Sequence, residues 1–190
     1  MEIRISDVAG VYLLIAFFGF FFALSLYQIE YLAMVLRAAG LNVSLLFPRM
    51  AQVTIFAPWL LIIAGIMVFA FIFSYLRFSS VARLIIPRID IRREISKDKI
   101  FQGGLTAVRL IVYNPTGINL DRVTITDMVP DAFDIVFGEN HMETNLPAGG
   151  RVELSYVLRA AARGAHIIGP VVLTVMDNMS MFETEYEFPL

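Results

Sequence analysis

Hydrophobic residues run without interruption in two stretches near the start of the chain and alternate with polar residues afterwards. Residues 8–29 and residues 53–76 hold no charged side chain over 22 and 24 positions. At a rise of about 1.5 Å per residue, either stretch forms a helix long enough to cross a hydrocarbon core of about 30 Å. The sequence therefore predicts two transmembrane helices, at about 8–29 and 53–76.

The first stretch is also compared with a secretory signal peptide. Such a peptide has a basic start, an apolar core of about 7–15 residues and a small-residue cleavage site. Here the apolar run is longer, and the polar start carries Glu2 and Asp7 beside Arg4. These features favour a retained helix.

The ends of the two helices are less sharply defined. Residues 31–40 either continue the first helix or lie along the membrane interface, and Gly40 is a plausible stop. Pro58 falls early in the second stretch. Either the helix begins near Pro58, where a missing N–H costs nothing, or its first turn is kinked there.

Charge divides the chain at the same place. The first 78 residues carry seven charged side chains, and the remaining 112 carry 25. We therefore expect a membrane hairpin at 1–78 and a water-soluble domain at 79–190. The chain has no cysteine, which excludes disulfides, thiolate metal sites and cysteine nucleophiles and is compatible with a reducing cytoplasm.

Basic residues near the helix ends predict the orientation of the hairpin. The loop between the helices offers Arg37 and Arg49, whereas seven basic residues follow the second helix: Arg77, Arg83, Arg88, Arg92, Arg93, Lys97 and Lys99. This imbalance predicts that both termini are cytoplasmic. The basic run is interpreted as a solvated strand face plus a topology signal, or as a patch for anionic lipid head groups.

After residue 79 the apolar period becomes two, which is typical of strands. In the first such run, Ile89, Ile91, Arg93 and Ile95 fall on one face. About seven strands are predicted, at 88–95, 105–114, 122–130, 132–137, 151–158, 169–177 and 181–188. The pattern predicts an antiparallel immunoglobulin-like β-sandwich, with a partly open barrel as the alternative.

Candidate catalytic and metal-binding residues are few. Glu139, His141 and Glu143 would share one face of a strand, but exposed side chains explain the pattern better than a metal does. His166 lies in a turn and is expected to be structural or solvated. Four aspartates are expected to cap turns or face solvent rather than form a catalytic pair: Asp121, Asp127, Asp131 and Asp134.

The sequence assigns no catalytic residue, no cofactor and no metal site. It contains no Walker A loop, no G-x-S-x-G, no H-E-x-x-H and no dinucleotide fingerprint. Residues 100–190 hold five basic and eleven acidic residues, whereas nucleic-acid binding needs the opposite balance. These observations favour a non-enzymatic protein that binds a lipid bilayer and a protein partner.

The expected soluble domain carries a series of sequence motifs, each present once. In chain order they are an Asn-Pro turn, VTITDMVP, LPAGGRVELSYVLRA and ARGAHIIGPVVLTVMD. The series resembles the domain of unknown function 58 family, membrane proteins often encoded beside MoxR-type AAA ATPases. The matching positions are Asn114, Asp127, Pro130, Leu146, Gly149, Tyr156, Arg163, Gly164, Gly169, Pro170 and Asp177. The two N-terminal helices fit as well, so the resemblance covers nearly the whole chain.

The resemblance implies a membrane-anchored β-domain and a MoxR-type ATPase as partner. Family members usually continue into a von Willebrand A-like domain, and this sequence ends first, either as a short relative or as the first part of a longer protein. Physically, Gly164 and Gly169 suit turns, and Pro170 suits a strand start. Arg163 is expected to cap carbonyls or to pair with Asp177.

Two functions remain open. The first is a membrane-tethered scaffold or adaptor that displays the β-sandwich to a protein partner, for instance by strand addition. The alternative is a structural subunit of a larger membrane assembly, which the run of phenylalanines between Phe17 and Phe22 would suit equally well as lipid contact.

Overall fold

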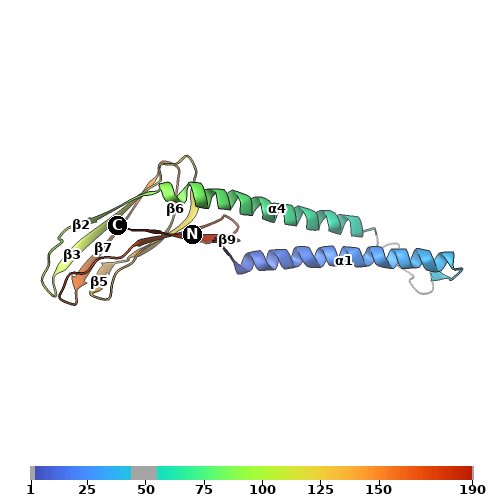
Figure 1. Cartoon of the computed structure of the whole chain (residues 1–190), viewed down its shortest axis with the longest axis horizontal. Coiled ribbons are helices and arrows are strands. Elements are labelled where there is room, and N and C mark those ends of the chain that lie inside the picture. The colour runs from blue at the N-terminus through green and yellow to red at the C-terminus, as the bar shows by residue number, and fades with distance from the viewer. Residues whose placement is uncertain (1–2, 44–54, 190) are drawn as a thin grey trace. The chain divides into compact units, whose positions relative to one another are not determined.

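The computed structural model describes residues 3–43 and 55–189. The chain divides into two compact units (Figure 1). One unit is helical and covers residues 7–76. The other, called the β-domain below, combines residues 3–6 with residues 77–189. The predicted pair of long apolar helices followed by antiparallel sheets is confirmed.

Helix α1 spans Asp7–Ala38. It is longer than predicted, because residues 31–38 continue the helix. Gly40 ends it with a φ of 80°, a conformation that glycine adopts without strain. The N–H of Gly40 donates to the carbonyl of Arg37, and that of Leu41 donates to Leu36, both at 3.0 Å. This pair of bonds is a Schellman cap, so the predicted stop at Gly40 is confirmed.

Helix α4 spans Ala57–Leu84 and is followed by the short helix η1, Ile86–Arg88. Pro58 lies in its first turn, which confirms that the helix begins near this proline. Residues 53 and 54 of the predicted helix lie outside the described residues. At the other end the helix continues eight residues past the predicted end at 76.

Alanines occupy most of the buried positions of the helical unit. Along α1 the alanines at 9, 16 and 23 are buried at intervals of seven residues, and α4 buries Ala57 and Ala64 at the same interval. A seven-residue interval keeps one face of a helix toward a neighbouring helix. Because alanine is small, this spacing is typical of helices that approach each other closely. Most of the large apolar side chains of both helices are exposed instead.

Nine strands form two antiparallel sheets in the β-domain (Figure 1). The five-stranded sheet has the order β1-β9-β8-β4-β6, and the four-stranded sheet has the order β2-β3-β7-β5. The strands are β1 Ile3–Ile5, β2 Asp90–Ile95, β3 Leu105–Tyr113, β4 Leu120–Asp127, β5 Phe133–Gly138, β6 His141–Leu146, β7 Arg151–Ala160, β8 Val171–Met176 and β9 Phe182–Phe188.

Alternate residues of the central strands form the core of the β-domain. Leu110 of β3, Leu158 of β7 and Leu173 of β8 are fully buried, and so are their neighbours two positions away on β3 and β8. Burying each such side chain stabilises the fold by about 1.5–3 kcal/mol. The period-two pattern seen in the sequence therefore marks the side of each sheet that faces the core.

The structure has nine strands where the sequence predicts about seven. The two strands that were missed are β1 and β6. Strand β1 has three residues and precedes a long apolar run, so it offers no alternation to detect. Strand β6, HMETNL, is mostly polar and pairs with β4 alone among the described strands. Both are edge strands, and each is held by hydrogen bonds to one neighbouring strand only.

Strand β1 brings the start of the chain into the β-domain. Its residues pair with β9, with Ile3 opposite Thr184 and Ile5 opposite Phe182. The N–H of Ser6 then donates to the carbonyl of Met181 at 2.9 Å. The segment before α1 is therefore part of the same domain as the strands after α4.

The last turns of α4 also belong to the β-domain. Phe78 is buried and stacks on Phe182, with 6.0 Å between ring centroids. Ala82 and Ile86 are fully buried. The β-domain thus includes the end of α4, from Arg77 onward, in addition to its strands.

Candidate functional site

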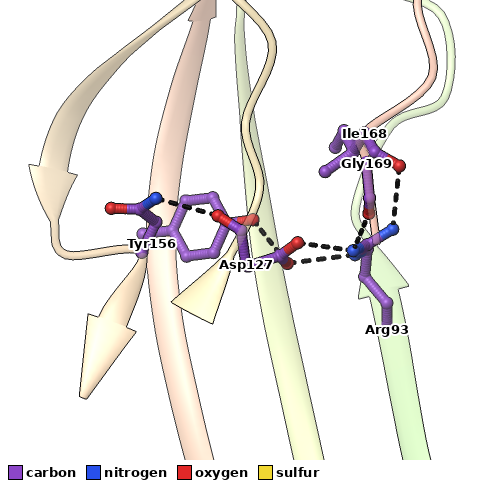
Figure 2. A network of polar contacts seen from close by, with 6 residues as sticks. Arg93, Asp127, Tyr156, Ile168 and Gly169 are labelled. Atoms are coloured by element: carbon purple, nitrogen blue, oxygen red, sulfur yellow. Dashed lines mark hydrogen bonds and ion pairs between the residues drawn. The ribbon is translucent and has the colours of Figure 1, made fainter. Parts of the chain in front are cut away.

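A polar network lies inside the β-domain, between its two sheets (Figure 2). Arg93 of β2 donates from Nε to Asp127 Oδ2 at 3.0 Å and from Nη2 to Asp127 Oδ1 at 2.5 Å. The hydroxyl of Tyr156 of β7 donates to Asp127 Oδ2 at 2.7 Å. Asp127 ends β4 in the other sheet, so these bonds connect the two sheets.

The network is almost completely shielded from water. The side chains of Arg93 and Asp127 are 7% and 0% exposed. A two-pronged guanidinium–carboxylate pair offsets the high cost of removing both charges from water. Burial, together with the hydrogen bond to Asp127, raises the pKa of the Tyr156 hydroxyl above its ordinary range. The tyrosine is therefore held as a neutral donor.

Arg93 also fixes a loop. Its Nη1 donates to the carbonyl of Ile168 at 3.2 Å, and its Nη2 donates to that of Gly169 at 2.7 Å (Figure 2). The N–H of Gly169 donates to the carbonyl of Met128 at 2.8 Å, and the N–H of Met128 donates to the carbonyl of Pro170 at 3.2 Å. The segment before β8 is thus tied both to Arg93 and to the end of β4.

This close approach explains the glycine at position 169. A Cβ there would lie 3.0 Å from the carbonyl oxygen of Met128 and 3.1 Å from the Met128 Cβ. Pro170 follows directly and precedes β8, where its missing N–H interrupts no pairing. Gly164, with a φ of 129°, adopts a conformation that other residues rarely take.

Asp127 and Arg93 correct two of the sequence interpretations. Asp127 was expected to cap a turn or face solvent, yet it is the buried centre of the network. Arg93 was grouped with a basic flank that faces solvent, yet it points into the core. Among the other aspartates, Asp134 forms an exposed ion pair with Arg159 at 2.8 Å. Asp127 and Tyr156 are among the positions that carry the sequence resemblance, whereas Arg93 is not.

Asn114 organises a second buried cluster, in the turns between strands. Its side-chain amide donates to the carbonyls of Ile118, Leu146 and Pro147 at 2.9–3.2 Å. Its Oδ1 accepts from the N–H and the hydroxyl of Thr116. Pro130 has a simpler role, because its carbonyl accepts from the N–H of Phe133 at 3.0 Å at the start of β5. Asn114 and Pro130 therefore stabilise the conformation of the turns in which they lie.

Asp177 holds the turn between β8 and β9. Its carboxylate accepts from the N–H groups of Met179, Met181 and Phe182. Arg163, which was expected to cap carbonyls or to pair with Asp177, donates to the side-chain carbonyl of Gln102 at 3.0 Å. The Asp177 carboxylate therefore binds backbone donors of its own turn.

The two histidines lie apart. His141 is near Glu139 at 3.7 Å, and both side chains are largely exposed. Within residues 3–43 and 55–189 no group of three metal-ligating side chains comes together. His166 lies edge-on to the ring of Phe133, with 5.9 Å between centroids. It lines a cleft rather than a metal site.

That cleft has a volume of about 550 Å³ and lies beside the Arg93 network. Two loops border it, residues 96–104 after β2 and residues 161–170 before β8. Its apolar lining comes from Ile95, Ile100, Phe133, Ile167 and Ile168, and its polar lining from Arg93, Lys97, Asp98, Thr106 and His166. Two residues of the sequence resemblance, Asp127 and Gly169, therefore bond to Arg93, which lines this cleft.

Comparisons with known proteins leave the chain without an assignment. No family model and no curated protein matches the sequence. Among solved structures, the GH20 exo-β-N-acetylglucosaminidase of Vibrio harveyi is similar over 53% of this chain and 17% of its own, with 8% identity and a TM-score of 0.35. This chain thus spans less than a fifth of that enzyme.

Two smaller domains are similar at the same level. The GAE domain of GGA2p from Saccharomyces cerevisiae matches over 55% of this chain and 90% of its own, with 14% identity and a TM-score of 0.33. The yeast delta-COP-I mu-homology domain matches over 48% and 40%, with 14% identity and a TM-score of 0.32. Scores this low support no inference about activity or partners.

Proposed function

We propose that this protein is a membrane-tethered scaffold or adaptor, in which two transmembrane helices hold an immunoglobulin-like β-sandwich at the cytoplasmic face for a protein partner. The observation that carries the proposal is the pairing of β1 with β9. The chain enters the helices from the β-domain and returns to it. If the helices cross a bilayer, they must form a hairpin with both ends on one side.

The surface of the helices supports a membrane environment. Both α1 and α4 are long and apolar enough to cross a bilayer. Large side chains such as Phe17, Phe21 and Phe69 are exposed, while the buried positions are mostly alanines. A soluble helical pair would show the reverse arrangement, with large apolar side chains inside.

Basic residues support the cytoplasmic side. Arg77, Arg83 and Arg88 follow the apolar part of α4, and all three are exposed. No described carboxylate forms an ion pair with any of them. Unpaired basic residues next to a helix end favour retention on the cytoplasmic side.

The buried polar groups support a binding role rather than catalysis. Arg93, Asp127 and Tyr156 are engaged with one another and with backbone carbonyls. Among the described residues, every buried side-chain nitrogen or oxygen has a partner. A network satisfied in this way rigidifies a domain. The resemblance to the domain of unknown function 58 family suggests a MoxR-type AAA ATPase as the partner.

Cysteine labelling tests the topology, because the natural chain has no cysteine. Three single-cysteine variants suffice: Arg4→Cys, Leu41→Cys and Phe101→Cys. In sealed inverted vesicles, a membrane-impermeant maleimide should label positions 4 and 101 but not 41. In right-side-out vesicles, it should label only position 41. Labelling of all three from one side would contradict a membrane hairpin.

Co-purification from native membranes tests the partner. The full chain, tagged and extracted in mild detergent, should bring down a MoxR-type ATPase in stoichiometric amounts. Absence of the ATPase and of any other stable partner would overturn the scaffold proposal.

A structural subunit of a larger membrane assembly is the second candidate. Phe17 and Phe21 stack along α1, with 6.2 Å between ring centroids, and form an apolar ridge that a neighbouring span would fit. Lipid chains fit it as well. A detergent-solubilised protein that behaves as a single-chain particle would count against this candidate.

A further inference from the structure

We propose that the cleft between residues 96–104 and 161–170 is the docking site for a short apolar segment of a protein partner, flanked by acidic residues. The proposal rests on the scaffold function above and names where, and by what chemistry, the partner is recognised.

The two loops form one structural unit. The N–H of Gly103 donates to the carbonyl of Ala160 at 2.8 Å, and the side-chain amide of Gln102 donates to Ala161 at 3.0 Å. Arg163 donates in turn to Gln102 at 3.0 Å. These bonds connect the beginning of one loop to the end of the other. The cleft is thereby built before any partner arrives, which lowers the cost of binding.

The wall of the cleft is held from inside by the buried network. Arg93 lines the cleft and bonds to the carbonyls of Ile168 and Gly169 (Figure 2). Asp127 and Tyr156 keep Arg93 in place from the opposite sheet. A buried charge pair is a costly way to shape a loop. Here it gives Ile167 and Ile168 a fixed backbone at the rim.

Exposed apolar side chains gather at this rim. Ile167 is 84% exposed and Ile95 is 43% exposed, and nearby Phe101 is 93% exposed. Isolated apolar residues are common on protein surfaces, but a group beside a preformed cleft is typical of an interaction site. Covering these side chains would supply most of the binding free energy.

Charge indicates the flanks of the partner segment. The two loops carry Lys97, Lys99 and Arg163 against a single acid, Asp98. No ion pair joins these three cations to a carboxylate among the residues that the structure describes. Outside the two loops the chain after position 99 is acidic, with eleven acidic and four basic residues. The two loops that border the cleft thus carry a net positive charge, which attracts an acidic segment.

The position of the cleft suits a partner in the cytoplasm. Residues 96–104 follow the end of β2, whereas α4 leads into the start of β2. Residues 161–170 precede β8, whereas β8 ends at the turn that contacts Ser6. Within the β-domain, the cleft therefore lies at the end opposite the entry of β1 and α4. A partner can reach it without approaching the segments that join the helices.

The test is a selection of phage-displayed random dodecapeptides on the full chain in lipid nanodiscs. We expect enrichment of peptides with adjacent apolar or aromatic residues beside Asp or Glu. Affinity of an enriched peptide should fall at least about tenfold in Ile167→Ser, since one large side chain loses its contact. Lys97→Glu should weaken it to a similar degree, and Lys97→Arg should leave it unchanged.

Phe137→Ser is the matched apolar control, because Phe137 is 75% exposed on the edge strand β5, outside the cleft. Its binding should equal that of the natural chain. No enrichment, enrichment of basic peptides, or loss with Phe137→Ser in place of Ile167→Ser would each overturn the proposal. The cysteine labelling and ATPase co-purification are independent of these results, so the scaffold proposal stands or falls separately.

Discussion

The helical unit and the β-domain place their apolar side chains in opposite ways. Most buried positions of α1 are alanines, and its phenylalanines lie on the outside. The β-domain buries Tyr156, Phe182 and a set of leucines, isoleucines and valines, and it turns many charged side chains outward. One physical rule explains both patterns, because apolar side chains face apolar surroundings. The comparison supports the proposal that α1 and α4 face lipid, whereas the β-domain packs its large apolar side chains inside.

The two units also differ in the number and burial of their ionisable side chains. The described helices carry few ionisable side chains, whereas the β-domain contains the fully enclosed Asp127. The domain tolerates this charge because three hydrogen bonds from Arg93 and Tyr156 reach it. The following substitutions test the contrast, from the largest expected effect to the smallest.

Asp127→Ala should destabilise the β-domain by about 3–5 kcal/mol, because it leaves the Arg93 guanidinium buried without a counter-charge. Urea unfolding of the full chain in nanodiscs, followed by the far-UV signal of the strands, measures the loss. Asp134→Ala is the control. It breaks an exposed pair with Arg159 and should cost less than about 1 kcal/mol. Equal losses would show that Asp127 is not a special position.

Phe21→Lys should impair membrane insertion of α1, at a cost of about 2.5–3.5 kcal/mol for a lysine near the middle of a span. The fraction of chain resistant to alkaline extraction from membranes measures insertion. Phe101→Lys places the same change on an exposed loop of the β-domain and should have no effect. If both variants stay fully inserted, the outward phenylalanines do not face lipid.

Tyr156→Phe should cost about 1.5–3 kcal/mol at neutral pH, because Asp127 loses a donor. It should also change the response to alkali. The folded-state pKa of Tyr156 is raised above the ordinary value of about 10, so its contribution is complete below pH 10 and is lost as pH rises further.

The natural chain should therefore lose up to about 1.4 kcal/mol more per pH unit above pH 10 than Tyr156→Phe does. Urea unfolding at pH 9 and at pH 11 compares the two chains. Identical slopes would contradict the enclosed state of the tyrosine hydroxyl.

Gly169→Ala and Gly65→Ala should change the free energy of unfolding in opposite directions. At position 169 a Cβ meets the backbone of Met128, and we expect a loss of about 1 kcal/mol. At position 65 of α4 a Cβ meets nothing within 4 Å, so the helix should gain up to about 1 kcal/mol. Thermal unfolding monitored separately for strands and helices distinguishes the two. Gly117→Ala, in open space on the β-domain, serves as the neutral control.

Much of the fold was predictable because it depends on local pattern. Long stretches without charged residues identified both helices, and the alternation of apolar and polar residues identified most strands. Strand β6 was not predictable, since HMETNL gains its pairing from β4 rather than from its own apolar content. Strand β1 depends on Phe182 and Thr184, nearly the whole chain away. No local signal encodes such a partner.

The candidate site was predictable only in part. The resemblance included Asp127, Tyr156 and Gly169, which the structure brings close together. The alternation in the sequence had placed Arg93 on the same strand face as Ile89, Ile91 and Ile95. That signal was outweighed by its basic neighbours, because a charge among apolar positions is usually solvated. Only the buried carboxylate opposite, supplied by another sheet, reveals its role.

The pairing of Ile5 with Phe182 has a consequence for biosynthesis. Strand β1 cannot find its neighbour until more than 170 further residues have been translated. Contacts between such distant segments form late and slowly. The residues of β1 must therefore wait, unpaired, while both apolar helices are synthesised. Pairing of β1 with β9 then joins the segment before α1 to the strands after α4.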